Sequence, residues 1–215
     1  MDDRVVRLSE GDAERAAAVL VRAFHDDPFH AYLIPNPDER DRLWQTLYTA
    51  AVRFGCLYGE SWAVTDPAGD ALAAVAYGFP VPGGEFTPER MARSGLTTAA
   101  DMWGARDWQR FETTMAAIEA AKSRVMPTPH WYLLTVGADP AWQRRGLGGV
   151  LIERFLARAA GDRVPACLWT MQPANVPFYE RHGLAVAVDG VEPTSGLPYW
   201  IFRRLADTPE PIPQR

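Results

Sequence analysis

The sequence predicts an α/β protein, and three observations lead to this class. Short apolar runs rich in Val, Leu and aromatic residues alternate with longer segments in which apolar residues recur every three or four positions. Turns rich in glycine and proline separate the two kinds of segment. With 215 residues, of which 47% are hydrophobic, the chain is long enough for one sizeable core. The predicted order of elements is β-α-α-β-β-α-α-β-α-β-α-β-β.

The first third of the chain is expected to form two helices and three strands. Ser9 and Asp12 predict a capping-box start for a helix whose apolar stripe extends to Phe24. The polar cluster from His25 to His30 is expected to supply turn residues at the end of this helix, and not metal ligands. The other expected segments are strands over 5–8, 60–65 and 71–79 and a second helix over 37–54.

The rest of the chain adds a helical insertion and a strand-rich end. A loop over 79–88, rich in proline and glycine, leads into the insertion at 87–126, which Pro127 and Pro129 end. A strand over 165–171, a hairpin loop over 190–198 and a last strand over 199–204 are expected further on. We expect one domain over residues 1–207 and a loose tail over 208–215.

Composition and charge narrow the range of partners. The net charge of −5 and the pI of about 5.4 disfavour nucleic acid and suit an amine-bearing substrate. The apolar runs are too short for a membrane span and the charged start lacks a secretion signal, so we expect a cytoplasmic protein with no membrane partner. Cys56 and Cys167 have no metal-ligand spacing, and no metal site is expected.

The most informative segment runs from His130 to Gly149. Asp139 and Pro140 stop an apolar strand, and a turn of the form Gln-x-x-Gly-x-Gly then leads directly into an amphipathic helix. Free amides at a helix N-terminus, glycines without a Cβ and two arginines together predict a pyrophosphate site. The turn lacks the Gly-Lys-Ser/Thr of a P-loop, and Leu151 stands where a dinucleotide fingerprint needs glycine.

This strand, turn and helix resemble the acyl-CoA signature of the GCN5-related N-acetyltransferase (GNAT) family. The resemblance implies the GNAT fold, a mixed and mostly antiparallel sheet flanked by helices, in which the CoA-binding strand diverges from the next strand. Gly137 is expected at a bulge that leaves strand amides free. The resemblance also implies acetyl-CoA as cosubstrate, bound by Val136, Gly137, Ala138, Gln143, Arg144, Arg145, Gly146, Leu147, Gly148, Gly149 and Asn175.

A second segment, from Asn175 to Leu184, resembles the family's Asn…Phe-Tyr-Glu-x-x-Gly-Phe element. Taken by themselves, Asn175 suits a helix N-cap, Pro177 a first turn and Gly183 the position after the helix. The resemblance implies that Asn175 helps to orient the pantetheine arm and that Tyr179 lies by the CoA sulfur. Tyr179 is then the expected catalytic acid for the leaving thiolate, because tyrosine and a thiol titrate within about two units of each other.

Within the family, the chain is most similar to the puromycin N-acetyltransferase-type subset. The shared features are a strand end of the form Thr-Val-Gly-x-x-Pro and a Pro-Phe-Tyr-Glu-Arg-x-Gly segment. We therefore expect an acyltransferase that moves acetyl directly to a primary amine of a small molecule, such as an antibiotic or another xenobiotic amine. A protein or peptide N-acetyltransferase and a catalytically silent acyl-CoA-binding sensor stay open as alternatives, as does a homodimer.

The acceptor pocket and the general base are defined least well. We expect the first two helices, the insertion and the last hairpin to form a pocket that suits a small aromatic amine. Its expected aromatic residues are Phe24, Tyr32, Trp44, Tyr48, Trp103, Trp108 and Trp200. The candidate bases are Asp26, Asp27, Glu85, Glu112 and Glu119, with His25 and His30 near in sequence.

Overall fold

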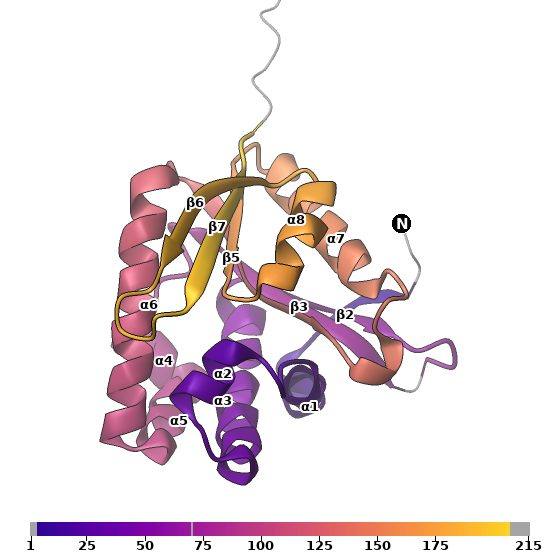
Figure 1. Ribbon diagram of the computed structural model, residues 1–215. Helices are drawn as coiled ribbons and strands as arrows, with labels where there is room; N and C mark the ends of the chain where they lie inside the picture. The colour runs from indigo at the N-terminus through magenta and orange to yellow at the C-terminus, as the bar shows by residue number, and fades with distance from the viewer. Residues whose placement is uncertain (1–3, 70, 207–215) are drawn as a thin grey trace, which may run out of the picture.

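A seven-stranded sheet runs through the computed structural model, which describes residues 4–69 and 71–206 (Figure 1). Its strands are β1 Val5–Arg7, β2 Glu60–Thr65, β3 Leu72–Val81, β4 His130–Ala138, β5 Ala166–Thr170, β6 Ala185–Val191 and β7 Pro198–Arg204. They lie in the order β1-β2-β3-β4-β5-β7-β6. All neighbouring pairs are antiparallel except β4 and β5. This topology confirms the predicted mixed, mostly antiparallel sheet.

Helices cover both faces of this sheet (Figure 1). They are α1 Ala13–Ala23, α2 Pro28–Leu33, α3 Pro37–Tyr58, α4 Pro88–Ser94, α5 Leu96–Trp103, α6 Ala105–Val125, α7 Leu147–Gly161 and α8 Val176–Arg181. Side chains alternate between the two faces along a strand. Ala63 of β2 therefore belongs to the core that contains α1 and α3, whereas its neighbours Trp62 and Val64 belong to the core that contains α7.

The start of the chain folds as its capping residues predict. Ser9 donates through its Oγ to the Asp12 carboxylate at 2.7 Å, and the Ser9 amide donates to the same oxygen at 3.0 Å. The bond from the Ser9 amide to the Asp12 side chain and a bond from the Asp12 amide to the Ser9 side chain form the predicted capping box, and α1 follows. The helix predicted over 37–54 is present as α3 and continues to Tyr58. The predicted insertion is helical and contains α4, α5 and α6.

Helix α2 corrects the interpretation of the polar cluster as a simple helix end. The Asp27 carboxylate accepts hydrogen bonds from the amides of Phe29 at 2.9 Å and His30 at 3.3 Å, and Pro28 occupies the first turn. An acidic N-cap followed by proline is a helix start, because proline needs no amide partner there. The cluster therefore begins a new six-residue helix after α1 has ended.

Strands β4 and β5 separate soon after they begin. Their parallel pairing joins Trp131 to Ala166 and Tyr132 to Cys167, and beyond this point β4 pairs only with β3 among the described strands. The predicted divergence of the CoA-binding strand is thus present. It leaves one edge of β4 open, where backbone amides can bind a ligand.

The bulge in β4 lies at Leu134 and not at Gly137, where we expected it. Thr135 pairs with Tyr77 and Leu133 with Gly78, so Leu134 is the extra residue. Gly137 pairs regularly with Val75. Its lack of a side chain serves packing instead, because a Cβ there would lie 2.9 Å from the Phe24 ring at the end of α1.

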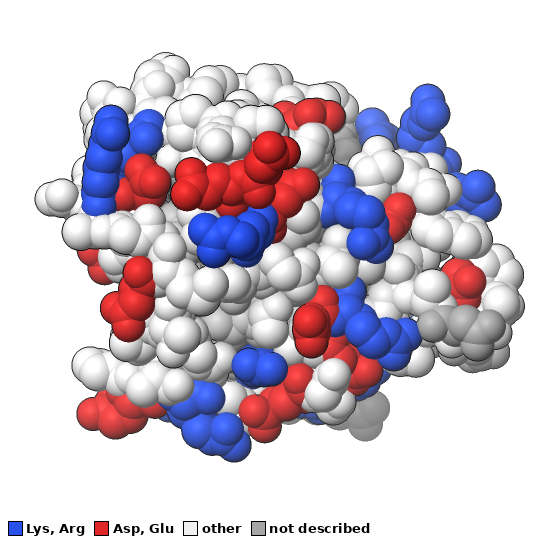
Figure 2. All heavy atoms as spheres, turned by 90° about the horizontal axis from the view of Figure 1, so that it is seen from below, with Lys and Arg blue, Asp and Glu red and all other residues white. Residues whose placement is uncertain are grey.

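The remaining expectations concern the end of the chain and its surface. Strands β6 and β7 form the predicted hairpin, while the predicted tail over 208–215 lies outside the described residues. No helix in the described part of the chain is long and apolar enough to cross a membrane. Seen from below, acidic and basic side chains are interspersed (Figure 2). This face therefore lacks the extended basic surface that nucleic acid binding uses.

Candidate active site

A cavity of about 580 Å³ opens at the point where β4 and β5 separate. Its lining comes from β3, β4, β5, α2, α3, α4, α5, α6 and α8, which are far apart in sequence and are brought together by the fold. Apolar and aromatic side chains form most of the lining, and a few polar side chains lie among them. This combination is typical of a cavity that binds a ligand or carries out a reaction.

The predicted pyrophosphate turn has the geometry of an anion site. Gly146 is the N-cap of α7 with φ of 81°, and Arg144 also has a positive φ of 60°. The helical ladder begins with the bond from the Val150 amide to the Gly146 carbonyl at 3.1 Å, so the amides of residues 147–149 have no partner in the helix. These amides and the positive end of the helix dipole can face a phosphate.

Arginine side chains complete the charge of this turn. Arg144 and Arg145 are exposed, and the Arg145 guanidinium lies 4.6 Å from the centre of the Trp142 ring. Stacking of this kind orients a guanidinium while its N–H groups stay free for another ligand. The Gln143 amide group donates to the Ala138 carbonyl at 3.2 Å and ties the turn to the end of β4.

The open edge of β4 presents amides at two positions that the sequence predicted. The Asp139 amide bonds to the Ala73 carbonyl of the β3 side at 2.9 Å. Backbone groups alternate in direction along an antiparallel strand, so the amides of Val136 and Ala138 point away from β3 and toward the gap. The bond from Gln143 to the Ala138 carbonyl lies on this same open side.

Tyr179 and Asn175 both line the cavity. Asn175 does not cap α8 with its side chain, contrary to the reading from its residue type, and donates instead to the Thr170 hydroxyl at 3.3 Å. Burial raises the pKa of Tyr179, and the charge of Asp27 raises it further. Tyr179 therefore stays protonated, but the expected close match between its pKa and that of a thiol is wrong for this buried ring.

The part of the cavity beside α2 and α6 is lined by aromatic residues, and these residues differ in part from the set that we expected. Phe24, Trp44, Tyr48 and Trp108 line it, whereas Tyr32, Trp103 and Trp200 are outside the lining. The last hairpin contributes no lining residue among those described. Phe29, Phe111 and Trp169 take part instead, because α2, α6 and β5 lie against the chamber. Phe29 and Trp169 meet edge to face at 5.7 Å between ring centres.

Four of the candidate carboxyl groups line the cavity, and they differ in their partners. Glu119 pairs with Lys122 at 2.7 Å, and Glu85 pairs with Arg90 at 3.1 Å. Asp27 and Glu112 complete the set, and no arginine or lysine is paired with them among the described residues. Asp26 and His25 lie outside the lining.

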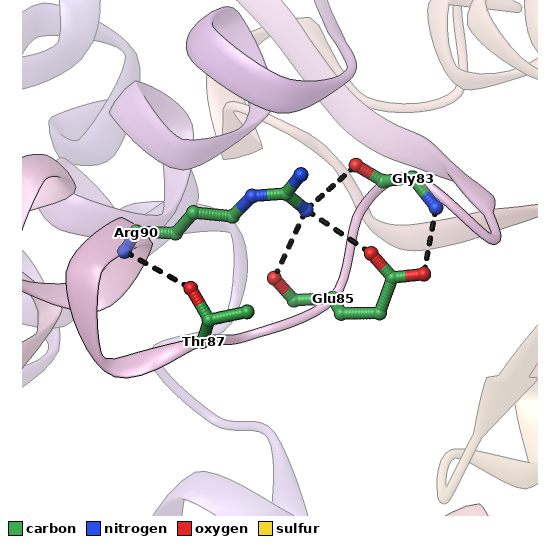
Figure 3. Close-up of polar contacts among 4 residues, drawn as sticks. All are labelled: Gly83, Glu85, Thr87 and Arg90. Carbon is green, nitrogen blue, oxygen red and sulfur yellow. Dashed lines mark hydrogen bonds and ion pairs between the residues drawn. The ribbon is translucent and has the colours of Figure 1, made fainter.

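The loop between β3 and α4 closes one side of the cavity through a compact polar network (Figure 3). The Glu85 carboxylate accepts from the Gly83 amide at 2.7 Å and from Arg90. Arg90 also donates to the Gly83 carbonyl at 2.7 Å and to the Glu85 carbonyl at 3.3 Å. Glu85 is thus engaged in holding the loop, which leaves Asp27 and Glu112 as the carboxyl groups free of cation partners.

Across residues 4–69 and 71–206, no group of three His, Cys, Asp or Glu side chains has the arrangement of a metal site. His25 pairs with Asp41 at 3.1 Å, and His30 is bonded to Tyr48 at 2.9 Å.

Comparison with known proteins agrees with this geometry. The model of the Acetyltransferase (GNAT) family matches residues 23–184, so the chain belongs to the GNAT family. An uncharacterized N-acetyltransferase of Schizosaccharomyces pombe is 27% identical over 184 residues, which are 82% of this chain and 72% of that protein.

Solved structures share the fold. A Corynebacterium glutamicum structure, described as histone acetyltransferase HPA2 and related acetyltransferase, has a TM-score of 0.69 at 21% identity and covers 98% of this chain and 100% of its own. The polyamine N-acetyltransferase of Drosophila melanogaster has a TM-score of 0.61 at 13% identity, over 94% of this chain and 98% of its own. The protein is therefore an acyltransferase with the GNAT fold, and members of this family use acetyl-CoA as the acetyl donor.

Proposed function

We propose that the protein transfers acetyl from acetyl-CoA directly to a primary amine of a small molecule. The observation that carries the proposal is one continuous cavity, which extends from Tyr179 and Asn175 at the β4–β5 gap to an aromatic chamber beside α2 and α6. A cavity of about 580 Å³ with helices over it suits a small acceptor better than an extended peptide. Within the family, the likeness to the puromycin N-acetyltransferase-type subset supports the same substrate class.

The donor site is assigned to the turn and to the open strand edge. Amides of residues 146–149 and the side chains of Gln143, Arg144 and Arg145 would hold the CoA pyrophosphate. The amides of Val136 and Ala138 would bond the thioester oxygen and stabilise the oxyanion that forms on it. Asn175 would orient the pantetheine arm beside Thr170. Gly137 supports this edge by letting α1 pack closely on it.

The chemistry needs one proton acceptor and one proton donor from the protein. Asp27 takes one proton from the ammonium group, the neutral amine nitrogen attacks the thioester carbonyl carbon, the carbon–sulfur bond breaks, and the nitrogen releases its second proton to water. Tyr179 donates its hydroxyl hydrogen to the leaving sulfur, so that the products are an amide and free CoA thiol. Asp27 and Tyr179 then restore their own protonation states through solvent. Holding both substrates in one cavity contributes to the rate by positioning.

Asp27 is chosen among the candidate bases because of its surroundings. It lines the cavity, it has no cation partner, and its charge acts on the Tyr179 hydroxyl. Burial raises the pKa of the Asp27 carboxyl, although the amides of His30 and Phe29 oppose this shift. A raised pKa makes a carboxylate a better base for an ammonium group. Tyr179, with its own pKa raised, acts mainly as a hydrogen-bond donor until negative charge develops on sulfur.

The test is release of CoA thiol from acetyl-CoA across a panel of arylalkylamines, puromycin, aminoglycosides, polyamines and short peptides. Fast release with a small amine is the expected result, and release with peptides alone would favour the protein or peptide acetyltransferase. Tyr179→Phe should lower kcat about a hundredfold or more. Tyr32→Phe, the same change outside the cavity lining, should leave kcat unchanged. Tight acetyl-CoA binding with no release for any amine would favour a silent sensor and overturn the proposal.

A further inference from the structure

Two buried polar side chains of the acceptor chamber are bonded to each other. The Tyr48 hydroxyl oxygen of α3 lies 2.9 Å from Nε2 of His30 in α2, and both residues line the cavity. The His30 ring also stacks on Trp44, with 3.6 Å between ring centres and 17° between planes. His30 is 5% exposed and Tyr48 4%, so neither side chain exchanges its partner for bulk water.

The direction of this hydrogen bond follows from the chemistry of its two groups. A phenol hydroxyl is the stronger donor of the two, and the nitrogen of a neutral imidazole that carries no hydrogen is the better acceptor. Burial, and then the nearby Arg40, lower the pKa of His30 well below its usual value, so the ring is neutral. Nε2 is therefore without hydrogen and accepts from the Tyr48 hydroxyl.

The consequence is a fixed polarity for Tyr48. Its one hydroxyl hydrogen is committed to His30, so toward the chamber the oxygen offers only lone pairs. A ligand group that donates hydrogen bonds is attracted there, and a carbonyl or ether oxygen is repelled. Asp27 is a second acceptor in the same cavity, whose lining it shares with Tyr48.

We propose that the Tyr48 oxygen and the Asp27 carboxylate together bind the ammonium group of the acceptor, and that His30 is a positioning residue that keeps Tyr48 an acceptor. This inference rests on the proposed function, because it names how the same chamber selects its substrate. After Asp27 removes a proton, the Tyr48 oxygen still holds an N–H of the neutral amine. The nitrogen lone pair is then left to face the thioester carbonyl.

The aromatic rings define the rest of the ligand. Phe29, Trp44, Phe111 and Trp169 line the chamber around this polar point. A primary amine on a short chain that ends in an aromatic ring fits such a chamber, since its head donates and its body is apolar.

The experiment measures binding, so that it does not depend on turnover. Calorimetry with CoA-loaded protein would compare 2-phenylethylamine with 4-phenyl-2-butanone, a neutral ketone that can only accept. The wild type should bind the amine and discriminate against the ketone. Tyr48→Phe should weaken amine binding about tenfold, the usual effect of losing a hydrogen bond to a charged group. Tyr32→Phe should bind the amine as the wild type does.

A second variant separates positioning from simple structural support. His30→Phe keeps a ring against Trp44 but removes Nε2, which frees the Tyr48 hydrogen to turn into the chamber. Amine binding should weaken and ketone binding should strengthen, whereas a merely structural loss would weaken both. Equal amine affinity in Tyr48→Phe and wild type, with CoA binding intact, would overturn the inference. Amine binding without thiol release would refute the proposed reaction and leave the ammonium site standing.

Discussion

Replacing Gly137 by alanine tests whether the close contact between α1 and β4 is a requirement of the fold. A Cβ at this position would lie 2.9 Å from a Phe24 ring carbon, 3.0 Å from the Ala23 Cβ and 3.1 Å from a Leu20 methyl. One clash could be relieved by a ring rotation. Three at once require α1 to move away from the strand, because the Ala23 Cβ is fixed to the helix backbone.

The magnitude follows from two opposing terms. Overpacking of a well-packed core costs about 1–3 kcal/mol. Replacing a glycine by alanine lowers the conformational entropy of the unfolded chain, which stabilises the folded state by about 0.4–1 kcal/mol. The net loss in the free energy of unfolding should be about 1–2 kcal/mol, which lowers the Tm of a chain of this length by about 2–8 °C.

The assay is denaturant and thermal unfolding, with acetyl-CoA and amine binding measured on the same samples. Amine affinity should fall, because Phe24 lines the chamber and its ring stacks with Tyr48 at 6.0 Å. Acetyl-CoA affinity should change less, since the turn before α7 is untouched. Gly161→Ala, at the last residue of α7 with open space around its Cβ, is the matched control and should be neutral or stabilising. Equal stability of Gly137→Ala and wild type would refute the packing argument.

Two further substitutions test the donor turn and the base. Gly146→Ala places a Cβ at a φ of 81° with no atom within 4 Å of it. Backbone strain alone should therefore cost about 1–2 kcal/mol and weaken acetyl-CoA binding in calorimetry. Undiminished affinity would contradict the assigned turn geometry. Asp27→Asn keeps an N-cap residue but should abolish thiol release. Because burial raises the folded-state pKa of Asp27, its ionisation destabilises the wild type as pH rises through that pKa. Asp27→Asn should therefore gain stability relative to the wild type between acid and neutral pH, and a constant difference across a pH series of unfolding curves would contradict this sign.

The strand, turn and helix of the proposed donor site could be predicted because they are adjacent in sequence. A strand, a glycine- and arginine-rich turn and a helix within twenty residues specify where free amides lie, and Gly146 with its positive φ agrees with that pattern. The roles of Val136 and Ala138 at the thioester stay predictions. The position of the bulge could not be predicted in this way. Gly137 lacks a Cβ because α1 packs on it, and a tertiary contact of this kind leaves no local signal in the sequence.

The acceptor side depended on contacts between distant segments. Tyr48 and His30 are eighteen positions apart, and their bond exists only because α2 folds against α3. Trp169 joins the chamber through the separation of β5 from β4, which a single sequence does not locate. One local pattern does indicate α2. Asp27 followed by Pro28 has the form of a helix start, with an acidic N-cap before a proline in the first turn.

Helix α2 connects the parts of the acceptor side. One Asp27 oxygen caps the helix by accepting two amides, which leaves the other carboxylate oxygen for the chamber. The same cap sets the first turn, and that turn carries His30 to Tyr48. A change at Asp27 that removes the cap should therefore alter amine selectivity as well as proton transfer. Asp27→Ala should lose the discrimination between amine and ketone, while Asp27→Asn, which still caps but lacks the charge, should lose only the part of it that the charge supplies. If both variants lose it equally, the charge of Asp27 and not the placement of α2 sets the selectivity.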